Sequence, residues 1–223
     1  GKYSVFKGFH LCAKQGDDKD ESTDWLDLRE PGEEGSIFDN SHKDCIACYS
    51  KDSIPETSWD ECRSKLSELD TSKEHFVGGE STGWDIHEIV IDFDAKNEKG
   101  EKDLGRNKLL AANWPRTYAE TSKSGSGLHL HYYYTGSDVK SLERRISPDV
   151  EVKVFVGKSS LRRRLIRCNR EPIATLRPGL LKIKEEKMIN FNEFKDAEHL
   201  RNFVKKCLAK AHHGSTKPEI DYM

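Results

Sequence analysis

Ionisable residues alternate with apolar ones in three short segments of this chain. The segments are Ile89-Val90-Ile91-Asp92-Phe93-Asp94, then Leu128-His129-Leu130-His131, then Val150-Glu151-Val152-Lys153-Val154. Side chains of a β-strand point alternately to its two faces, so each segment predicts a strand with one polar face and one apolar face. Acidic residues are seldom placed in strands for stability. If the three strands are neighbours, their carboxylates form the kind of site that metal-dependent phosphoryl transfer needs.

The predicted catalytic residues and metal ligands are Asp92, Asp94 and Glu151. Mg²⁺ and Mn²⁺ are hard cations that prefer such oxygen ligands. In nucleotidyl transfer, two of these ions lower the pKa of the attacking 3′-hydroxyl and neutralise the leaving pyrophosphate. Asp149 is an alternative candidate for the single carboxylate. We favour Glu151, because Glu151 alternates with the valines of its own segment.

Nucleotide binding is predicted for polar and basic residues around these carboxylates. The candidates are Ser124, Ser126, His129, Lys153, Lys158 and Arg162. The serines belong to a Ser-Gly-Ser-Gly stretch that could also be a simple hairpin turn, and Lys158 lies in a turn that could simply be solvated. His131 competes with His129 for the histidine position, and the glycine spacing favours His129.

The composition is compatible with a partner that carries phosphate. The 223 residues are 35% hydrophobic and 34% charged, with a net charge of −2, so we expect a modest core and a heavily charged surface. Residues 16–34 are acidic, whereas residues 162–177 are rich in arginine. The arginines suit a nucleic acid or a nucleotide. No long apolar stretch and no signal pattern is present, so we expect a soluble, cytoplasmic protein.

The six cysteines are expected to be reduced thiols, because no secretory signal precedes them. Cys45 and Cys48 have the spacing of zinc ligands, and Cys62, Cys12 or His42 could complete such a site. A second close pair of cysteines is missing. Free cysteines are therefore favoured over zinc ligands.

The hydrophobic pattern also predicts the elements that position these residues. Strands are expected over residues 86–93, 117–121, 128–135 and 150–156. Helices are expected over residues 59–69, 106–114, 138–146 and 196–211. A hairpin is expected over residues 173–183, with its turn at Pro178-Gly179, and residues 212–223 have the composition of a linker.

The order of the motifs resembles that of the archaeo-eukaryotic primase superfamily, and looks most like the primase-polymerases of phages and mobile elements. In that family the first motif is an acidic pair, the second is a small residue followed by histidine, and the third is a single carboxylate. The matching residues here are Asp92 and Asp94, then Ser124-Gly125-Ser126-Gly127-Leu128-His129, then Glu151. Residues 154–163 also resemble a phage branch of the family. The resemblance covers residues 84–185.

The resemblance implies a two-lobed α+β fold in which an RRM-like, mixed or antiparallel sheet carries the catalytic motifs. It implies an N-terminal α/β lobe over residues 1–82, a catalytic lobe over residues 83–185, and a C-terminal helix and linker over residues 186–223. The implied activity is that of a DNA primase-polymerase, which uses Mg²⁺ or Mn²⁺ and NTP or dNTP to make primers or DNA on single-stranded DNA. We also expect this chain to be a fragment that continues into a further C-terminal replication domain.

Two alternatives from other classes stay open. An HUH endonuclease, which nicks single-stranded DNA, also uses an RRM-like sheet, and His129-Leu130-His131 matches its His-apolar-His pattern. Such an enzyme needs a nucleophilic tyrosine, for which Tyr118 is the nearest candidate. The second alternative is a non-catalytic nucleic-acid-binding module. Carboxylates on the sheet disfavour it, because they repel phosphate unless a cation is bound.

Overall fold

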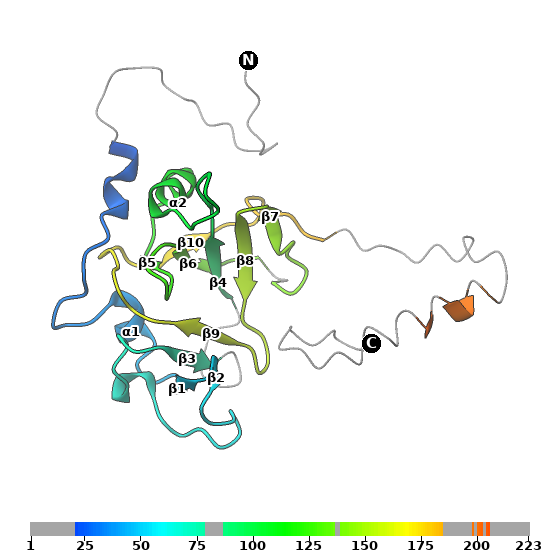
Figure 1. The fold of residues 1–223 in the computed structure, drawn as a ribbon, viewed down its shortest axis with the longest axis horizontal. Coiled ribbons are helices and arrows are strands. Elements are labelled where there is room, and N and C mark those ends of the chain that lie inside the picture. Colours follow the sequence, from blue (N-terminus) through cyan, green and yellow to red (C-terminus); the bar gives the residue numbers. More distant parts are fainter. Residues whose placement is uncertain are drawn as a thin grey trace, which may run out of the picture. The chain divides into compact units, whose positions relative to one another are not determined.

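The computed structural model describes residues 21–78, 87–136 and 139–184, together with residues 198, 200–202, 204 and 205. The described chain is α+β, with more strand than helix and with mainly antiparallel sheets (Figure 1). This agrees with the predicted fold class at the level of α+β. The chain divides into two units between residues 184 and 185. The sheets described below belong to the first unit, and none of the described helices is long and apolar enough to cross a bilayer.

The central element is a six-stranded sheet that contains all three predicted strands of the site. Its order is β10-β6-β4-β8-β7, and β5 also pairs with β6. The strands are β4 (Glu88–Phe93), β5 (Ala119–Thr121), β6 (Leu128–Tyr134), β7 (Arg145–Ser147), β8 (Val150–Val154) and β10 (Ala174–Leu176). Only β10 among these pairs in parallel, with β6. The three segments are therefore neighbours, as β6, β4 and β8, which meets the condition on which the predicted site depends.

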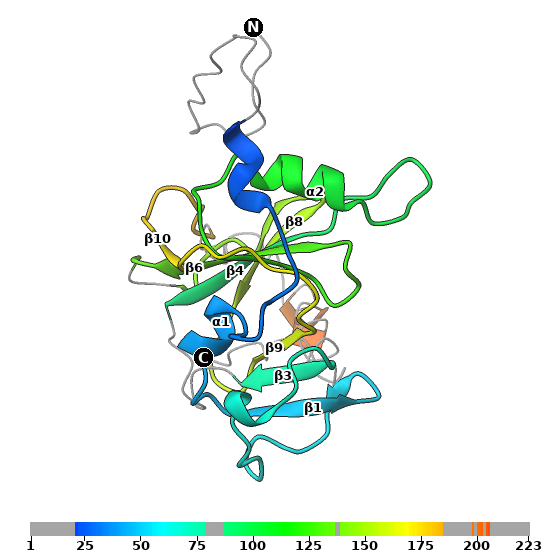
Figure 2. The same ribbon diagram turned by 90° about the vertical axis from the view of Figure 1, so that its left-hand side faces the viewer.

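One face of this sheet is apolar and is covered by helices. The residues of β4 that alternate with Asp92, namely Ile91 and Phe93, are fully buried together with Leu128 and Leu130 of β6. They pack with aromatic and aliphatic side chains that include those of α2 (Leu104–Ala111) and η1 (Glu21–Leu26). Figure 2 shows α2 on one side of β4 and β6, with β1, β3 and β9 on the other side. The polar face of the sheet therefore looks toward a second layer of strands.

The second layer is a four-stranded antiparallel sheet with the order β2-β1-β3-β9. Its strands are β1 (Ala47–Lys51), β2 (Ile54–Pro55), β3 (His75–Gly78) and β9 (Ser160–Arg163). The chain enters the six-stranded sheet after β3 and returns after β8 to supply β9. Two short helices, α1 (Ile37–Ser41) and η2 (Leu66–Glu68), accompany this layer.

A second apolar core joins the two sheets. Val90 of β4 and Phe155, just beyond β8, pack with Ala47, Val77 and Leu161 from the four-stranded sheet. Phe38 of α1 belongs to the same cluster and is fully buried. Burial of this apolar area stabilises the contact between the sheets at about 25 cal/mol per Å² removed from water. The polar groups that share this space must therefore find partners inside the protein.

The predicted strands and the central helix are confirmed, with shifted ends. The strands expected over residues 86–93, 117–121, 128–135 and 150–156 correspond to β4, β5, β6 and β8. The helix expected over residues 106–114 is α2, which begins earlier because Asp103 caps it by accepting a hydrogen bond from the Arg106 amide. Of the predicted C-terminal helix, the described residues 198, 200–202, 204 and 205 are helical. The linker over residues 212–223 lies outside the described residues.

Three other predicted elements are wrong, because backbone groups pair with distant segments instead of local ones. Residues 59–69 form turns and η2, and their amides and carbonyls bond the segment 43–47, as in Leu66 N to Cys45 O at 2.9 Å. In residues 138–146, Leu142 bridges to Ile183 and the strand β7 begins at Arg145. In residues 173–183 the expected turn at Pro178-Gly179 is present, but the strand before it, β10, pairs with β6 instead of forming a hairpin.

Candidate functional site

Four ionisable side chains form one row across the six-stranded sheet. Asp92 of β4 lies opposite His129 of β6 on one side and opposite Glu151 of β8 on the other. His129 in turn lies opposite Glu120 of β5. Residues that pair directly across strands share a face, so the four side chains are neighbours on the polar face. We call this set, Glu120, His129, Asp92 and Glu151, the polar row.

The carboxylates at one end of the polar row share a lysine. Lys153 Nζ lies 2.7 Å from Glu151 Oε2 and 3.4 Å from Asp92 Oδ2. On the other side of Asp92, His129 Nε2 lies 3.5 Å from Oδ1. Burial alone would raise the pKa of Asp92, but His129 and Lys153 lower it to about 2. Asp92 is therefore a carboxylate at neutral pH although it is mostly buried.

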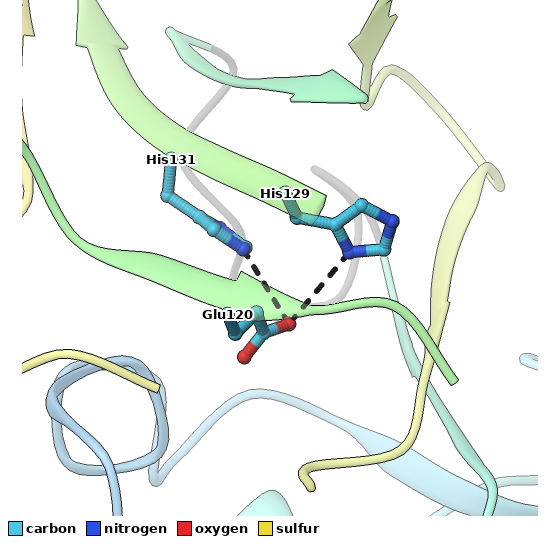
Figure 3. A group of neighbouring side chains, drawn as sticks. All are labelled: Glu120, His129 and His131. Atoms are coloured by element: carbon cyan, nitrogen blue, oxygen red, sulfur yellow. Dashed lines mark ion pairs between the residues drawn. The ribbon is translucent and has the colours of Figure 1, made fainter. Parts of the chain in front are cut away.

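The other end of the polar row is a buried group of Glu120, His129 and His131 that could hold a metal ion. One oxygen of Glu120, Oε1, lies 3.5 Å from His131 Nε2 and 3.9 Å from His129 Nδ1. Figure 3 shows both rings directed at this one oxygen from the same strand. Each residue offers a ligand atom, and these atoms lie within 4.8 Å of one another. Within the described structure, this is the group of three potential ligands that the fold brings together.

A buried arginine ties this group to the four-stranded sheet. Arg163 of β9 donates from Nε and Nη2 to the two oxygens of Glu120, at 3.0 and 2.5 Å. Its Nη1 lies 2.5 Å from Asp39 Oδ1 and 3.3 Å from His75 Nε2. The guanidinium also lies 4.3 Å from the centre of the Phe38 ring. Although burial raises the pKa of a carboxyl, Arg163 and the histidines hold the pKa of Glu120 well below its usual range.

The three histidines of this region differ in charge. Burial alone would lower the pKa of His129, but the carboxylates of Asp92 and Glu120 raise it to about 9. Burial lowers the pKa of His131 to about 4, with His129 and Arg163 acting in the same direction. Burial and Arg163 likewise lower the pKa of His75 to about 4. At neutral pH, His129 is therefore a cation between two carboxylates, whereas His131 and His75 are neutral.

We expect the stability of the metal-free protein to be greatest near pH 6.5. The ordinary pKa of histidine is about 6.5. Below this pH, His131 and His75 bind protons in the unfolded chain but stay neutral in the folded state, where their pKa values are about 4. The free energy of unfolding therefore falls as the pH drops from 6.5 toward 4, by a few kcal/mol at about 1.4 kcal/mol per pKa unit. His129 acts oppositely: its stabilisation is complete below pH 6.5 and is lost as the pH rises through about 9.

Urea denaturation in the presence of a chelator, at a series of pH values from 4.5 to 9.5, measures both limbs of this dependence. The His131→Phe variant should reduce the acid limb by about half, because His75 remains, and the His129→Gln variant should flatten the alkaline limb. A stability that is constant between pH 6.5 and 9 would contradict the charge assigned to His129.

Asp94, the second residue of the acidic pair, lies just beyond β4. Its Oδ1 is 2.7 Å from Lys102 Nζ, and both side chains are partly exposed. It also touches the loop between β5 and β6, because a Cβ atom on Gly127 would lie 2.7 Å from Asp94 Oδ1 and 2.7 Å from Ser122 Oγ. Only glycine therefore allows this loop to approach Asp94 so closely.

The predicted serines lie in this same loop, whereas two of the predicted basic residues lie elsewhere. Ser124 Oγ lies 3.1 Å from Ser122 Oγ, and the Ser126 carbonyl accepts a hydrogen bond from Asn107 at 2.9 Å.

Lys158 pairs with Asp60 at 2.8 Å on the surface. Arg162 lies on the opposite face of β9 from Arg163 and pairs with Glu74 at 2.9 Å. The structure therefore brings together Asp92, His129, Glu151 and Lys153, with Asp94 beside the loop of the serines.

The cysteines and tyrosines of the alternative interpretations occupy buried positions. Cys45, Cys48 and Cys62 are free and buried, and they form no three-residue ligand group within the described part of the chain. Cys12 lies outside the described residues.

The Tyr118 side chain is fully buried, and its hydroxyl donates a hydrogen bond to Glu120 Oε2 at 2.7 Å. In this position Tyr118 has no access to a DNA phosphate.

The sequence interpretation missed Glu120, Arg163, Asp39 and His75. For Glu120 a signal was present, because it stands between Ala119 and Thr121 in a predicted strand, as Asp92 stands between apolar neighbours. For Arg163 the sequence offered no such signal, because it is one of three consecutive arginines at residues 162–164. The strand pairing explains why Arg163 is the buried one: in β9 it faces the same side as Leu161, toward the core between the sheets.

Comparison with known proteins adds no relative to this description. No model of a protein family matches the sequence, and no curated protein matches it. The functional conclusion therefore depends on the geometry of the polar row and its surroundings.

Proposed function

We propose that this chain catalyses metal-dependent, template-directed nucleotidyl transfer on single-stranded DNA, as a DNA primase-polymerase. The observation that carries the proposal is the strand register that makes His129, Asp92 and Glu151 neighbours on one sheet face. These three residues come from the three sequence motifs of the resemblance, which are separated by up to 59 positions between Asp92 and Glu151. In a sheet unrelated to this family, no functional requirement would place these three residues in one row, so their register favours the resemblance.

The carboxylates fit the proposed role of Asp92, Asp94 and Glu151 as ligands of Mg²⁺ or Mn²⁺. Asp92 Oδ1 is buried and accepts no hydrogen bond from the described residues, so it retains the capacity to bind a cation. When bound, the ions would activate the 3′-hydroxyl and neutralise the leaving pyrophosphate. Lysine ammonium groups now neutralise these carboxylates, Lys153 on Asp92 and Glu151 and Lys102 on Asp94.

The same lysines supply charge for the nucleotide. A metal ion bound to the carboxylates would weaken the attraction that holds Lys102 and Lys153, and their ammonium groups could then neutralise a triphosphate. His129 is cationic at neutral pH and lies at the edge of the loop that contains Ser124 and Ser126. Charge-assisted hydrogen bonds from this ring and from the loop would orient the phosphates. Lys158 and Arg162 remain proposed phosphate ligands only if the nucleotide or template extends toward β9.

The proposed reaction is tested by incubating the protein with a single-stranded DNA template, labelled nucleotides and either Mn²⁺ or Mg²⁺. We expect extended or newly made strands on a denaturing gel, dependence on the metal ion, and no covalent bond between protein and DNA. Ribonucleotides and deoxyribonucleotides are supplied separately, because the geometry does not select between them.

The nicking alternative gives the opposite result in this experiment. An HUH endonuclease consumes no triphosphate and leaves DNA attached to a tyrosine. A DNA-linked protein band that disappears in the Tyr118→Phe variant would overturn the polymerase proposal. Absence of both products, with template binding retained, would instead identify a non-catalytic binding module.

A further inference from the structure

We propose that Glu120, His129 and His131 form a binding site for Zn²⁺, distinct from the carboxylates proposed to hold Mg²⁺ or Mn²⁺. The site lies between β5 and β6, in the polar layer that separates the two sheets (Figure 3). The three ligands are present whatever reaction the polar row performs, but the site shares His129 with the proposed nucleotide site. With zinc bound at Nδ1, this ring would carry no extra proton and would face Asp92 through Nε2 instead of donating to a phosphate.

The spacing of the three ligand atoms is close to that of a tetrahedral zinc site. Zinc binds histidine nitrogen and carboxylate oxygen at about 2.0–2.2 Å, which places neighbouring tetrahedral ligands about 3.4 Å apart. Glu120 Oε1 lies 3.5 Å from His131 Nε2 and 3.9 Å from His129 Nδ1. The third spacing, between the two histidine nitrogens, is bounded only by 4.8 Å, so the two rings would have to move together to bind one ion. Three protein ligands leave the fourth position to water.

The histidine nitrogens in this site lack hydrogen bonds, which is the second observation that points to a ligand. His131 is fully buried, and neither of its ring nitrogens has a hydrogen-bond partner among the described residues. The same holds for Nδ1 of His129. Leaving a buried polar atom without a partner destabilises a folded protein. A metal ion bound to His131 Nε2 and His129 Nδ1 would satisfy two of these atoms at once.

The chemistry of the donors selects the ion. Two neutral imidazoles and one carboxylate suit a borderline ion such as Zn²⁺. Mg²⁺ prefers oxygen ligands and keeps several waters, which a buried pocket lined by two imidazoles does not provide. The surroundings also hold the carboxylate ligand in place, since Tyr118 and Arg163 both donate hydrogen bonds to Glu120 Oε2, and Arg163 Nε also donates to Oε1, the proposed ligand atom. Such outer hydrogen bonds are typical of metal-binding carboxylates.

The charges around the site leave a deficit that matches a divalent cation. Four carboxylates gather here, those of Asp39, Glu120, Asp92 and Glu151, and the permanent cations that pair with them are Arg163 and Lys153. Two negative charges therefore remain. A Zn²⁺ ion would balance both of them.

Zinc at this site would also fix the ring of His129. Binding at Nδ1 leaves Nε2 as the nitrogen that carries the proton and faces Asp92, 3.5 Å away. The ion would thus hold one histidine tautomer and orientation beside the carboxylate and would link β5 to the centre of β6.

The test measures metal binding to the chelator-stripped protein without nucleotide or DNA, so that its outcome is separate from that of the polymerase assay. Titration with Co²⁺, which is visible by its d–d absorption, should give one tight site with no thiolate-to-cobalt charge-transfer bands. Zn²⁺ should displace the Co²⁺ and raise the Tm. The informative variant is His131→Phe, because the ring lies 4.9 Å from that of Phe38 and 5.2 Å from that of Tyr118, so an aromatic side chain suits the space.

We expect His131→Phe to lower the affinity for Zn²⁺ at least about tenfold and to abolish the rise in Tm, while the variant stays folded. The matched control is His75→Asn, which changes a buried histidine outside the ligand set and should keep the Zn²⁺-dependent rise in Tm. Equal Zn²⁺ affinity of His131→Phe and the unaltered protein would overturn the proposal. So would charge-transfer bands that show thiolate ligands, or the absence of any tight site in the unaltered protein.

Discussion

The Asp92→Asn variant is expected to incorporate nucleotides about 10²-fold more slowly, or worse, while keeping its fold. This prediction depends on the proposed function. Asp92 stands at the centre of the polar row, between His129 and Glu151, and its carboxylate is ionised at neutral pH. Asparagine keeps the volume but removes the negative charge that would hold a metal ion. A loss of several kcal/mol of transition-state stabilisation corresponds to this decrease in rate.

Single-turnover incorporation on a primed template, at several Mn²⁺ concentrations, separates weaker metal binding from slower chemistry. Glu151→Gln should behave in the same way, because Glu151 shares Lys153 with Asp92. The matched control is Asp149→Asn, at a position two residues before Glu151. The backbone carbonyl of Asp149 accepts a hydrogen bond from the Asp94 amide, and the Asp149 side chain has no assigned role. Unchanged rates for Asp92→Asn and Glu151→Gln, in folded protein, would remove the carboxylates from the site. A loss confined to Asp149→Asn would show that the wrong acid was chosen.

The alternation of residues was sufficient to predict which side chains share a face of the central sheet. In β4, Asp92 interrupts a run of apolar residues, and the fully buried Ile91 and Phe93 face the opposite core. The same rule placed His129 on the polar side of β6. Alternation has a period of two residues, so it holds wherever one face of a strand is buried. The motifs formed one site only if their strands were neighbours, and the order β6-β4-β8 meets that condition, although alternation alone did not predict the order.

The partners of these side chains could not be predicted, because they depend on contacts between distant parts of the chain. Arg163 bonds Glu120 across 43 positions and Asp39 across 124 positions. No local pattern distinguishes Arg163 from its neighbours, since an arginine run is compatible with a solvated turn. The prediction of a helix over residues 59–69 was wrong for a similar reason. The segment 59–69 has helical spacing, but its backbone bonds residues 43–47 instead.

The Arg163→Met variant is expected to lose about 3–5 kcal/mol of folding stability, which is the largest effect on stability that we predict. The guanidinium is buried and bonds both oxygens of Glu120, one oxygen of Asp39 and the ring of His75. Methionine fills much of the same space, so the loss would come from the charges left without a partner. A buried carboxylate that loses its cation typically costs this much. Arg164, the next residue, is exposed, and Arg164→Met should change stability by less than about 0.5 kcal/mol.

A double-mutant cycle then distinguishes loss of the ion pair from loss of packing. If the cost of Arg163→Met arises from an unpaired Glu120, the double variant Arg163→Met, Glu120→Gln should recover part of the stability, because glutamine removes the buried charge and keeps the shape. If the cost arises from packing against Phe38, the two losses should simply add. Urea denaturation at pH 7, with chelator present, measures all four proteins under one condition. An Arg163→Met variant as stable as Arg164→Met would show that the buried network does not hold the two sheets together. Recovery in the double variant would show that Glu120 needs a cation at this position, and that Arg163 supplies it from the neighbouring sheet.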